Sequence, residues 1–174
     1  MGLDMYLSVR KYVSAIDWRG VDKLGPEESI SDYPNLDYAE VTERLGLKPF
    51  IANAAHSGMN VTATAVYWRK ANAIHKWFVD NLADGVDDCR PLWVSTDHLK
   101  ELFFNVCEVL ASNKDPQVAE EVLPSEDGFF FGDTSYGEAY WDDLEYTQKA
   151  LEKILTLAES DEGKAVDFEY QASW

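Results

Sequence analysis

The chain has 174 residues, of which 46% are hydrophobic and 13% aromatic, and it carries a formal net charge of −17 at pH 7. This apolar content excludes intrinsic disorder, and a chain of this length buries enough apolar surface to fold without disulfides or a structural metal. The negative charge repels phosphate backbones and anionic lipids, so we expect no direct binding to nucleic acid or to a membrane surface.

The N-terminal residues and the cysteines indicate the compartment. The segment MGLDMYLSVRKYVSA lacks the apolar core of a signal peptide, because Asp4, Arg10 and Lys11 interrupt it. No apolar run approaches the roughly 20 residues of a membrane-spanning helix. Cys89 and Cys107 are too few for a disulfide framework and form no CxxC pair. We therefore expect a cytoplasmic protein with reduced cysteines and no membrane partner.

Alternating or uninterrupted apolar residues predict five strands. In 3–13 every second residue from Leu3 to Val9 is apolar, and the C-terminal segment alternates in the same way. The segment VTATAVYW favours a strand through its β-branched and aromatic residues, after a turn at 56–60. GFFFG is short and bounded by glycines, which favours a buried strand over a helix. The predicted strands cover 3–13, 61–68, 91–95, 128–132 and 165–170.

Apolar residues spaced three and four positions apart predict four helices. Ser95 or Thr96 is suited to cap the third of them, and Pro116 can open one or two helical turns in the linker that follows it. Residues 17–35 are rich in Gly, Pro, Ser and Asp, which predicts a loop. The predicted helices cover 36–47, 70–83, 96–113 and 138–159.

The order of these elements predicts the fold class. Strands are scattered among helices without regular βαβ alternation, which favours an α+β fold over a parallel α/β fold. We predict a single domain over residues 1–174, in which a mixed or mainly antiparallel sheet packs against about four helices.

The segment YWRKANAIHKWFVDN at 67–81 is the densest aromatic and polar motif. On a helical wheel, His75 falls in the same apolar stripe as Ile74 and Phe78. A histidine in such a stripe is more often a core residue satisfied by one or two hydrogen bonds than a catalyst. We therefore expect His75 to be buried and hydrogen-bonded, with a contact to a ligand as the alternative.

Trp68, Arg69 and Lys70 lie where a predicted strand meets a predicted helix. Free backbone N–H groups and the positive end of the helix dipole favour an anion at this position. Two basic residues here indicate an anionic partner, which is either a ligand phosphate or carboxylate or a carboxylate of the same chain. A net charge of −17 favours the internal ion pair. The candidate ligand-binding residues are Trp68, Arg69, Lys70, Asn72 and His75.

No motif indicates catalysis or a metal site. The chain contains no Walker loop and no GxGxxG, GxSxG or HExxH sequence. Asp87, Asp88 and Cys89 are adjacent, so their side chains point in different directions, and no pair of His or Cys residues has metal-site spacing. We predict no catalytic residue, no metal and no cofactor, and the balance is against an enzyme.

Several stretches resemble a family of small bacteriophage and prophage proteins. They are the MGLDMYL start, YWRKANAIHKWFVDN followed by DGVDDC, GFFFG followed by Tyr136, and the Ser-Trp end, whereas 17–60 and 112–126 do not match. The resemblance implies a single-domain protein of phage or prophage origin, located in the host cytoplasm if it is phage-encoded. The family has no established activity, so the resemblance transfers no catalytic residue.

Residues 112–174 hold 4 basic and 16 acidic side chains, a charge of −12. The acidity of the chain either keeps the protein soluble, which composition alone favours, or adapts it to high salt, or forms a surface that binds a basic surface on another protein. We favour a non-catalytic accessory protein that binds another protein, such as a host protein with a basic surface. The alternative is a small enzyme or ligand-binding protein for an anionic metabolite or nucleotide, with Arg69, Lys70, Asn72 and His75 around the anion. The 6 Trp, 9 Tyr and 8 Phe also allow a homo-oligomeric interface.

Overall fold

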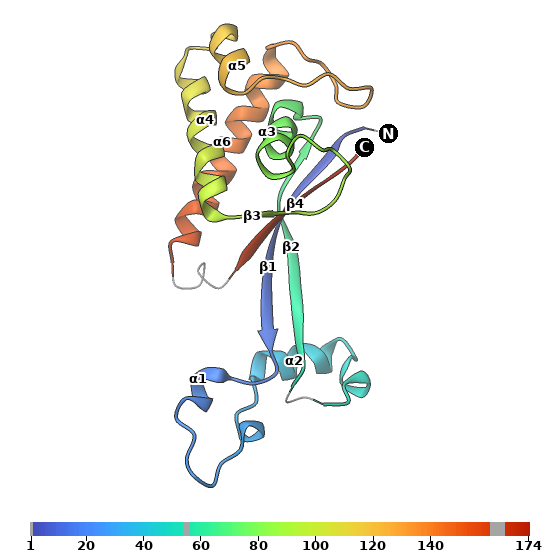
Figure 1. Cartoon of the computed structure of the whole chain (residues 1–174), viewed down its shortest axis with the longest axis vertical. Coiled ribbons are helices and arrows are strands. Elements are labelled where there is room, and N and C mark those ends of the chain that lie inside the picture. The colour runs from blue at the N-terminus through green and yellow to red at the C-terminus, as the bar shows by residue number, and fades with distance from the viewer. Residues whose placement is uncertain (1, 54–55, 161–165) are drawn as a thin grey trace. The chain divides into compact units, whose positions relative to one another are not determined.

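A computed structural model of the chain describes residues 2–53, 56–160 and 166–174 (Figure 1). Within these ranges the predicted α+β fold is confirmed, with six α-helices and a four-stranded antiparallel sheet. The strands are β1 (Asp4–Ser14), β2 (Gly58–Arg69), β3 (Leu92–Val94) and β4 (Asp167–Ser173), in the sheet order β2-β1-β4-β3. The α-helices are α1 (Trp18–Val21), α2 (Leu36–Arg44), α3 (Asn72–Leu82), α4 (Thr96–Ala111), α5 (Pro116–Val122) and α6 (Glu138–Ala158), and the 3-10 helices are η1 (Ile30–Asp32) and η2 (Lys48–Phe50).

The chain divides into two compact units. Unit 1 comprises Met1–Arg10 and Ala63–Trp174, and unit 2 comprises Lys11–Thr62. The cluster of buried apolar side chains that forms the hydrophobic core belongs to unit 1. Every candidate ligand-binding residue named from the sequence also lies in unit 1.

The sheet of unit 1 has one buried face, which results from the alternation along its strands. In the register of the sheet, Leu7 of β1 lies opposite Tyr170 of β4, and Tyr170 lies opposite Leu92 of β3. These three side chains are buried, whereas Tyr6 and Trp93, which point to the other face, are 37% and 64% exposed. An antiparallel sheet of this kind needs helices on one face only.

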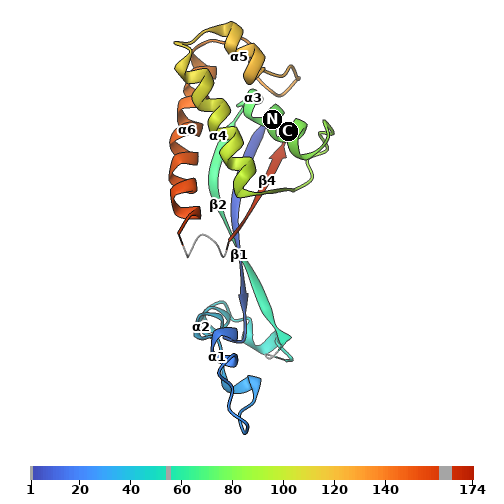
Figure 2. The same ribbon diagram turned by 60° about the vertical axis from the view of Figure 1, so that its left-hand side comes forward.

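Three helices of unit 1 cover the buried face. Phe78 of α3 stacks on Tyr170 with the ring centroids 3.9 Å apart, and its ring lies 6.3 Å from that of Trp68 at the end of β2. The indole Nε1 of Trp68 donates to Thr147 of α6 at 2.8 Å. Helix α4 lies beside α6 in both ribbon views (Figure 1, Figure 2). The apolar stripes of these helices therefore enclose one core over the sheet.

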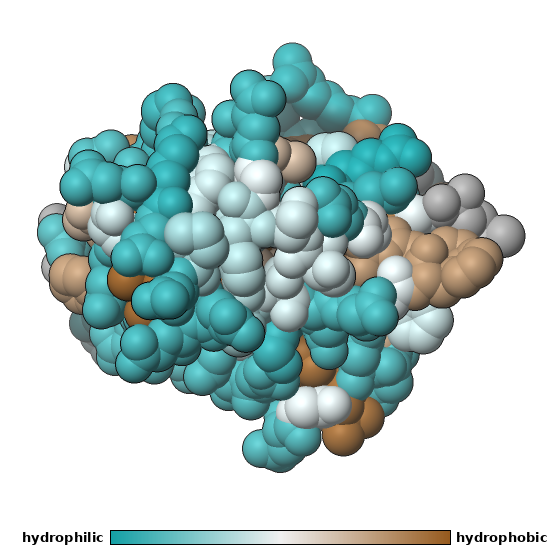
Figure 3. All heavy atoms as spheres, turned by 90° about the horizontal axis from the view of Figure 1, so that it is seen from above, coloured by the Kyte–Doolittle hydropathy of each residue, from teal (hydrophilic) through white to brown (hydrophobic). Residues whose placement is uncertain are grey.

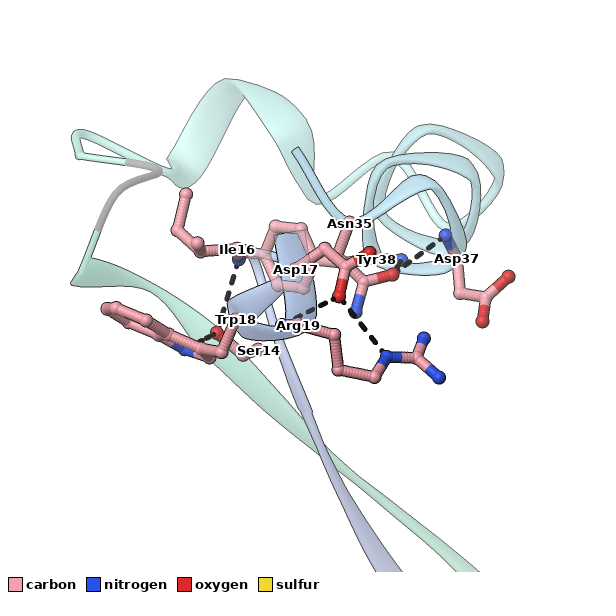
Figure 4. Close-up of polar contacts among 8 residues, drawn as sticks. All are labelled: Ser14, Ile16, Asp17, Trp18, Arg19, Asn35, Asp37 and Tyr38. Carbon is pink, nitrogen blue, oxygen red and sulfur yellow. Dashed lines mark hydrogen bonds and ion pairs between the residues drawn. The ribbon is translucent and has the colours of Figure 1, made fainter. Parts of the chain in front are cut away.

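Unit 2 is built from short helices with local caps (Figure 4). The side chain of Asn35 accepts from the backbone N–H groups of Asp37 at 3.0 Å and Tyr38 at 3.4 Å, which caps α2. Asp17 caps α1 by accepting from the backbone N–H of Arg19 at 3.2 Å. Few side chains of the described residues are buried in this unit: Ala15, Ile16, Tyr38 and Thr42.

The GFFFG segment is a turn, so the strand predicted at 128–132 is wrong. Phe131 N–H donates to Gly128 O at 3.0 Å, as in a tight turn, and Phe129 is 96% exposed. Gly132 has a φ of +94°, a conformation that glycine adopts without strain and that ends any extended run. Of the three phenylalanines, only Phe131 is buried in the core.

Smaller differences concern the bounds of elements. Residues 17–35 are not an uninterrupted loop, because the short helices α1 and η1 form inside them. β2 begins at Gly58, inside the turn predicted at 56–60. The strand predicted over 165–170 begins with residue 165, which lies outside the described residues. β4 begins at Asp167 and covers the predicted residues 167–170. The other predicted helices and strands are confirmed to within a few residues.

Candidate functional site

The candidate site begins where β2 turns into α3. β2 ends at Arg69 and α3 begins at Asn72, so Lys70 and Ala71 alone make the connection. Lys70 has a φ of +61°, a left-handed conformation that costs a non-glycine residue roughly 1–2 kcal/mol. Two hydrogen bonds hold it there: Lys70 N–H donates to Leu3 O at 2.8 Å, and Asn72 N–H donates to Lys70 O at 2.8 Å. The fold therefore holds Lys70 in an unfavourable backbone conformation.

Two glycines leave room for the Lys70 side chain. A Cβ atom added to Gly132 would lie 3.3 Å from Lys70 Cβ, and one added to Gly2 would lie 3.2 Å from Lys70 Cε. Next to these contacts, Leu3 N–H donates to Phe130 O at 3.1 Å. The start of the chain, the strand-to-helix junction and the GFFFG segment are distant in sequence, and they meet at Lys70.

Asn72 holds the segment 126–133 against the start of α3. Its side chain is buried, and Nδ2 donates to the carbonyl oxygens of Phe131 at 3.3 Å and Asp133 at 2.9 Å. Oδ1 accepts from the backbone N–H of Glu126 at 3.4 Å. Because both ends of this amide are engaged, Asn72 shapes the site and offers little free hydrogen-bonding capacity to a ligand.

A cavity of about 490 Å³ lies beside this junction. Its walls are the end of β2, the first turn of α3, the turn after Phe131 and the first two turns of α6. Small-molecule sites occupy roughly 300–1,000 Å³, so the volume suits a small ligand. The polar and charged residues that line it are Arg69, Lys70, Asn72, Asp133, Ser135, Glu138, Asp142 and Asp143.

The two helices that begin at this cavity have no side-chain caps. Ala71 occupies the N-cap position of α3 and Gly137 that of α6, and no side chain bonds to either cap position. Each of the other α-helices in the described ranges is capped by an Asp, Asn or Ser side chain. The first N–H groups of a helix have no partner inside it and carry the positive end of its dipole. Both uncapped starts lie at one cavity, and the carboxylate of Glu138 in the first turn of α6 offsets part of the positive charge there, whereas α3 has no acidic residue in its first turn.

Arg69 and Lys70 have no carboxylate partner among the described residues. In the part of the chain that the structure describes, no carboxylate oxygen lies within 4.0 Å of the side-chain nitrogen atoms of either residue. One turn further along α3, by contrast, Lys76 pairs with Asp80 at 2.8 Å. The internal ion pair expected from the sequence is therefore wrong for the described residues.

The acidic wall of the cavity consists of Asp142 and Asp143 on α6. Burial and, to a smaller extent, the neighbouring carboxylate of Asp142 together raise the pKa of Asp143 to about 6. Asp133 is occupied within its own turn, where hydrogen bonds from the side chain and backbone of Ser135 lower the pKa of Asp133. The cavity thus has a basic wall and an acidic wall that do not neutralise each other.

His75 lies away from this cavity and is engaged by the core. It is 1% exposed, its Nδ1 lies 2.7 Å from the Tyr170 hydroxyl, and its Nε2 lies 3.0 Å from Asp87 Oδ2. Burial raises the pKa of Tyr170 well above its usual value, so the phenol stays protonated and donates to Nδ1. Nε2–H then donates to the Asp87 carboxylate. The expectation of a buried, hydrogen-bonded histidine is confirmed.

The structure therefore divides the five candidate residues. Arg69, Lys70 and Asn72 line the cavity, whereas Trp68 and His75 belong to the core behind it. Sequence reasoning did not find the α6 start as the second wall, nor the role of Gly132. The sequence held no local signal for either, because glycine is a common N-cap residue and the role of Gly132 depends on a distant side chain.

A metal centre and a membrane-spanning helix find no support in the described residues. No group of three or more His, Cys, Asp or Glu side chains among them is placed to hold a metal ion. Cys89 and Cys107 are free thiols. None of the described helices combines the length and the apolar character that crossing a membrane requires.

Comparison of the chain with models of protein families, with curated proteins and with solved structures gives no match. The chemistry of the cavity is therefore the basis on which a function can be assigned.

Proposed function

We propose that this protein binds a small anionic ligand, such as a phosphorylated metabolite or a nucleotide, in the cavity between the starts of α3 and α6. One observation carries the proposal. Arg69 and Lys70 line this cavity with no carboxylate within 4.0 Å among the described residues, although the chain has 32 acidic residues. Two cations without an ionic partner at one cavity support a ligand that supplies the anion.

The chemistry of the basic wall suits a phosphate or carboxylate group. Arg69 offers a planar fork that can bind two oxygen atoms at once, and Lys70 offers a compact charge. Hydrogen bonds to a charged group contribute roughly 1.5–3 kcal/mol each, and a helix start adds about 0.3–1 kcal/mol. The only buried histidine of the described residues is engaged elsewhere, so we assign binding to this cavity and no reaction.

A thermal-shift screen against nucleotides, phosphorylated metabolites and inorganic phosphate tests this proposal. We expect at least one anion to raise the melting temperature of the wild-type protein, and Arg69→Ala to abolish that increase. Arg90→Ala is the matched control, because Arg90 pairs with Asp88 at 2.9 Å and does not line the cavity. The proposal is wrong if no anion stabilises the protein, or if Arg69→Ala responds as the wild type does.

A second candidate function is the binding of a protein partner with a basic surface, by an accessory protein of phage type. Its support is the charge of −12 on residues 112–174 and the exposure of acidic side chains on α5 and α6, including Glu120, Glu121 and Glu152. Figure 3 shows a face of the molecule that is mainly hydrophilic, with a few separate hydrophobic groups. Pull-downs from host lysate at low and high salt test this candidate, which loses its support if no partner is retained at low salt.

A further inference from the structure

We infer that the ligand of this cavity carries a protonated amine in addition to its anionic group. The inference rests on the proposed function, because it takes Arg69 and Lys70 as the residues that bind the anion. What it adds is a role for the acidic wall. Asp142 and Asp143 line the same cavity, and neither forms a salt bridge within 4.0 Å with any basic side chain of the described residues.

Among the described residues, charges of both signs thus line one cavity without an ionic partner. Opposite charges that can reach each other usually pair, as Lys76 and Asp80 do on α3. Asp142 and Asp143 are also neighbours of like charge, and the carboxylate of Asp142 disfavours the ionised form of Asp143. An ammonium group placed between them removes this repulsion, while an anionic group at the other wall meets Arg69. A ligand with charges of both signs therefore fits the cavity better than a simple anion.

Hydrogen bonds fix the separation of the two walls. The carbonyl oxygen of Asp143 accepts from Thr147 Oγ1 at 2.7 Å, and that hydroxyl accepts from Trp68 Nε1 at 2.8 Å. Trp68 immediately precedes Arg69 in β2, so the acidic end of the cavity on α6 is tied to the strand that carries the basic end. The cavity should therefore select for the distance between the two charges of its ligand.

The acidic wall also makes this preference dependent on pH. Asp143 faces the cavity together with Glu138 and Asp142 of its own helix, Arg69 and Lys70 of the β2–α3 junction, and Asp133 of the turn. Burial and Asp142 raise the pKa of Asp143 to about 6. Above this pH the carboxylate is charged and attracts an ammonium group, and below it the attraction weakens.

Three sulfonate and amine probes isolate the two charges. Taurine carries a sulfonate and an ammonium group, ethanesulfonate carries only the anion, and ethylamine carries only the cation. All three keep their charges between about pH 5 and about pH 8, so a change with pH reports on the protein. Titrations followed by calorimetry or NMR, at about pH 8, should give taurine a roughly tenfold lower Kd than ethanesulfonate and a lower Kd than ethylamine.

Two variants assign the effect to the two walls. Asp143→Asn should bring the Kd of taurine to that of ethanesulfonate and leave ethanesulfonate binding no weaker. Arg69→Ala should weaken both sulfonates. At about pH 5 the wild-type preference for taurine should fall toward the value of Asp143→Asn. Circular dichroism checks that both variants are folded.

The outcomes separate this inference from the function on which it rests. If wild type binds ethanesulfonate as tightly as taurine, or if Asp143→Asn keeps the preference for taurine, the amine is excluded while the anion site stands. If neither sulfonate binds, the inference is overturned, and the screen with nucleotides, phosphate and Arg69→Ala decides separately whether the cavity binds anions at all.

Discussion

The segment 67–81 contains polar residues in two different environments, the buried core and the wall of a cavity. His75 is buried, and each of its ring nitrogens has a hydrogen-bonding partner, in Tyr170 and Asp87. Arg69 and Lys70, which precede α3 in the same segment, line a cavity without an ionic partner among the described residues. Polarity alone therefore does not identify a ligand-binding site. A polar group with its bonding satisfied inside the core is structural, and an exposed charge at a cavity without an ionic partner is available to a ligand.

Replacing the histidine should have the largest effect on stability and none on the cavity. His75→Ala leaves Asp87 and Tyr170 without partners and creates a void in the core, so we expect the free energy of unfolding to fall by about 2–4 kcal/mol. Urea denaturation measures this change. His98→Ala is the control, because His98 accepts only one weak bond, from Ser95 N–H at 3.3 Å, and should cost under about 1 kcal/mol. If both variants lose the same free energy of unfolding, the proposed structural role of His75 in the core is wrong.

Gly132→Ala tests the packing around Lys70. The φ of +94° and the distance of 3.3 Å from the new Cβ to Lys70 Cβ both oppose a side chain, so we expect a loss of about 1–2 kcal/mol and weaker anion binding. Gly46→Ala is a matched control, since Gly46 has a φ of +66° and nothing within 4 Å of an added Cβ. That variant should lose stability from backbone strain alone and keep its anion binding. Weakened binding in both variants would mean that stability, and not the Lys70 contact, controls the site.

Local pattern accounts for most of the fold that could be predicted from sequence. The alternation from Leu3 to Val9 gives β1 its buried side, and Pro116 opens α5 as expected from its fixed φ. The strand predicted for the GFFFG segment is wrong because the conformation of this segment depends on distant residues. Gly132 makes room for Lys70, and Phe130 accepts from Leu3, and neither contact leaves a periodic signal in the sequence.

The candidate site was only half predictable for the same reason. Arg69 and Lys70 could be placed at a helix start from the order of elements alone. The start of α6 could not be brought beside them, because Gly137 is far along the chain and only tertiary packing unites the two helix ends. The partners of His75 were hidden in the same way, since Tyr170 lies on the last strand.

Asp143→Asn tests how the acidic wall affects stability. A carboxyl whose pKa is raised on folding contributes stability below its unfolded value near 3.8, and that contribution is lost as the pH rises through about 6. The charged form therefore destabilises the folded protein at neutral pH. We expect Asp143→Asn to be more stable than wild type by about 1 kcal/mol near pH 8, once its partial exposure is allowed for, and to match wild type near pH 4. Urea denaturation at the two pH values measures the difference, and a constant difference would contradict the assigned pKa shift.

Lys70→Gly should have the smallest of these effects on stability and, like Asp143→Asn, it should stabilise the protein. Glycine adopts a φ of +61° without strain, so we expect a gain of about 0.5–1 kcal/mol together with weaker anion binding. Lys70→Ala separates the two causes, because it removes the charge and keeps the strained backbone. It should lose anion binding as Lys70→Gly does but gain no stability. A Lys70→Gly protein that is less stable than wild type would show that the lysine serves the fold.

The proposed function places an anion at Arg69 and Lys70, in the cavity between the starts of α3 and α6. The most direct test is an NMR titration of isotopically labelled protein with the anion that gives the largest thermal shift, following backbone amide resonances. The account predicts that the largest shifts fall on the first-turn residues Ala73, Ile74, Ala139 and Tyr140, and that Arg69→Ala suppresses them. Shifts that leave these four amides unchanged, or that persist in Arg69→Ala, would contradict it.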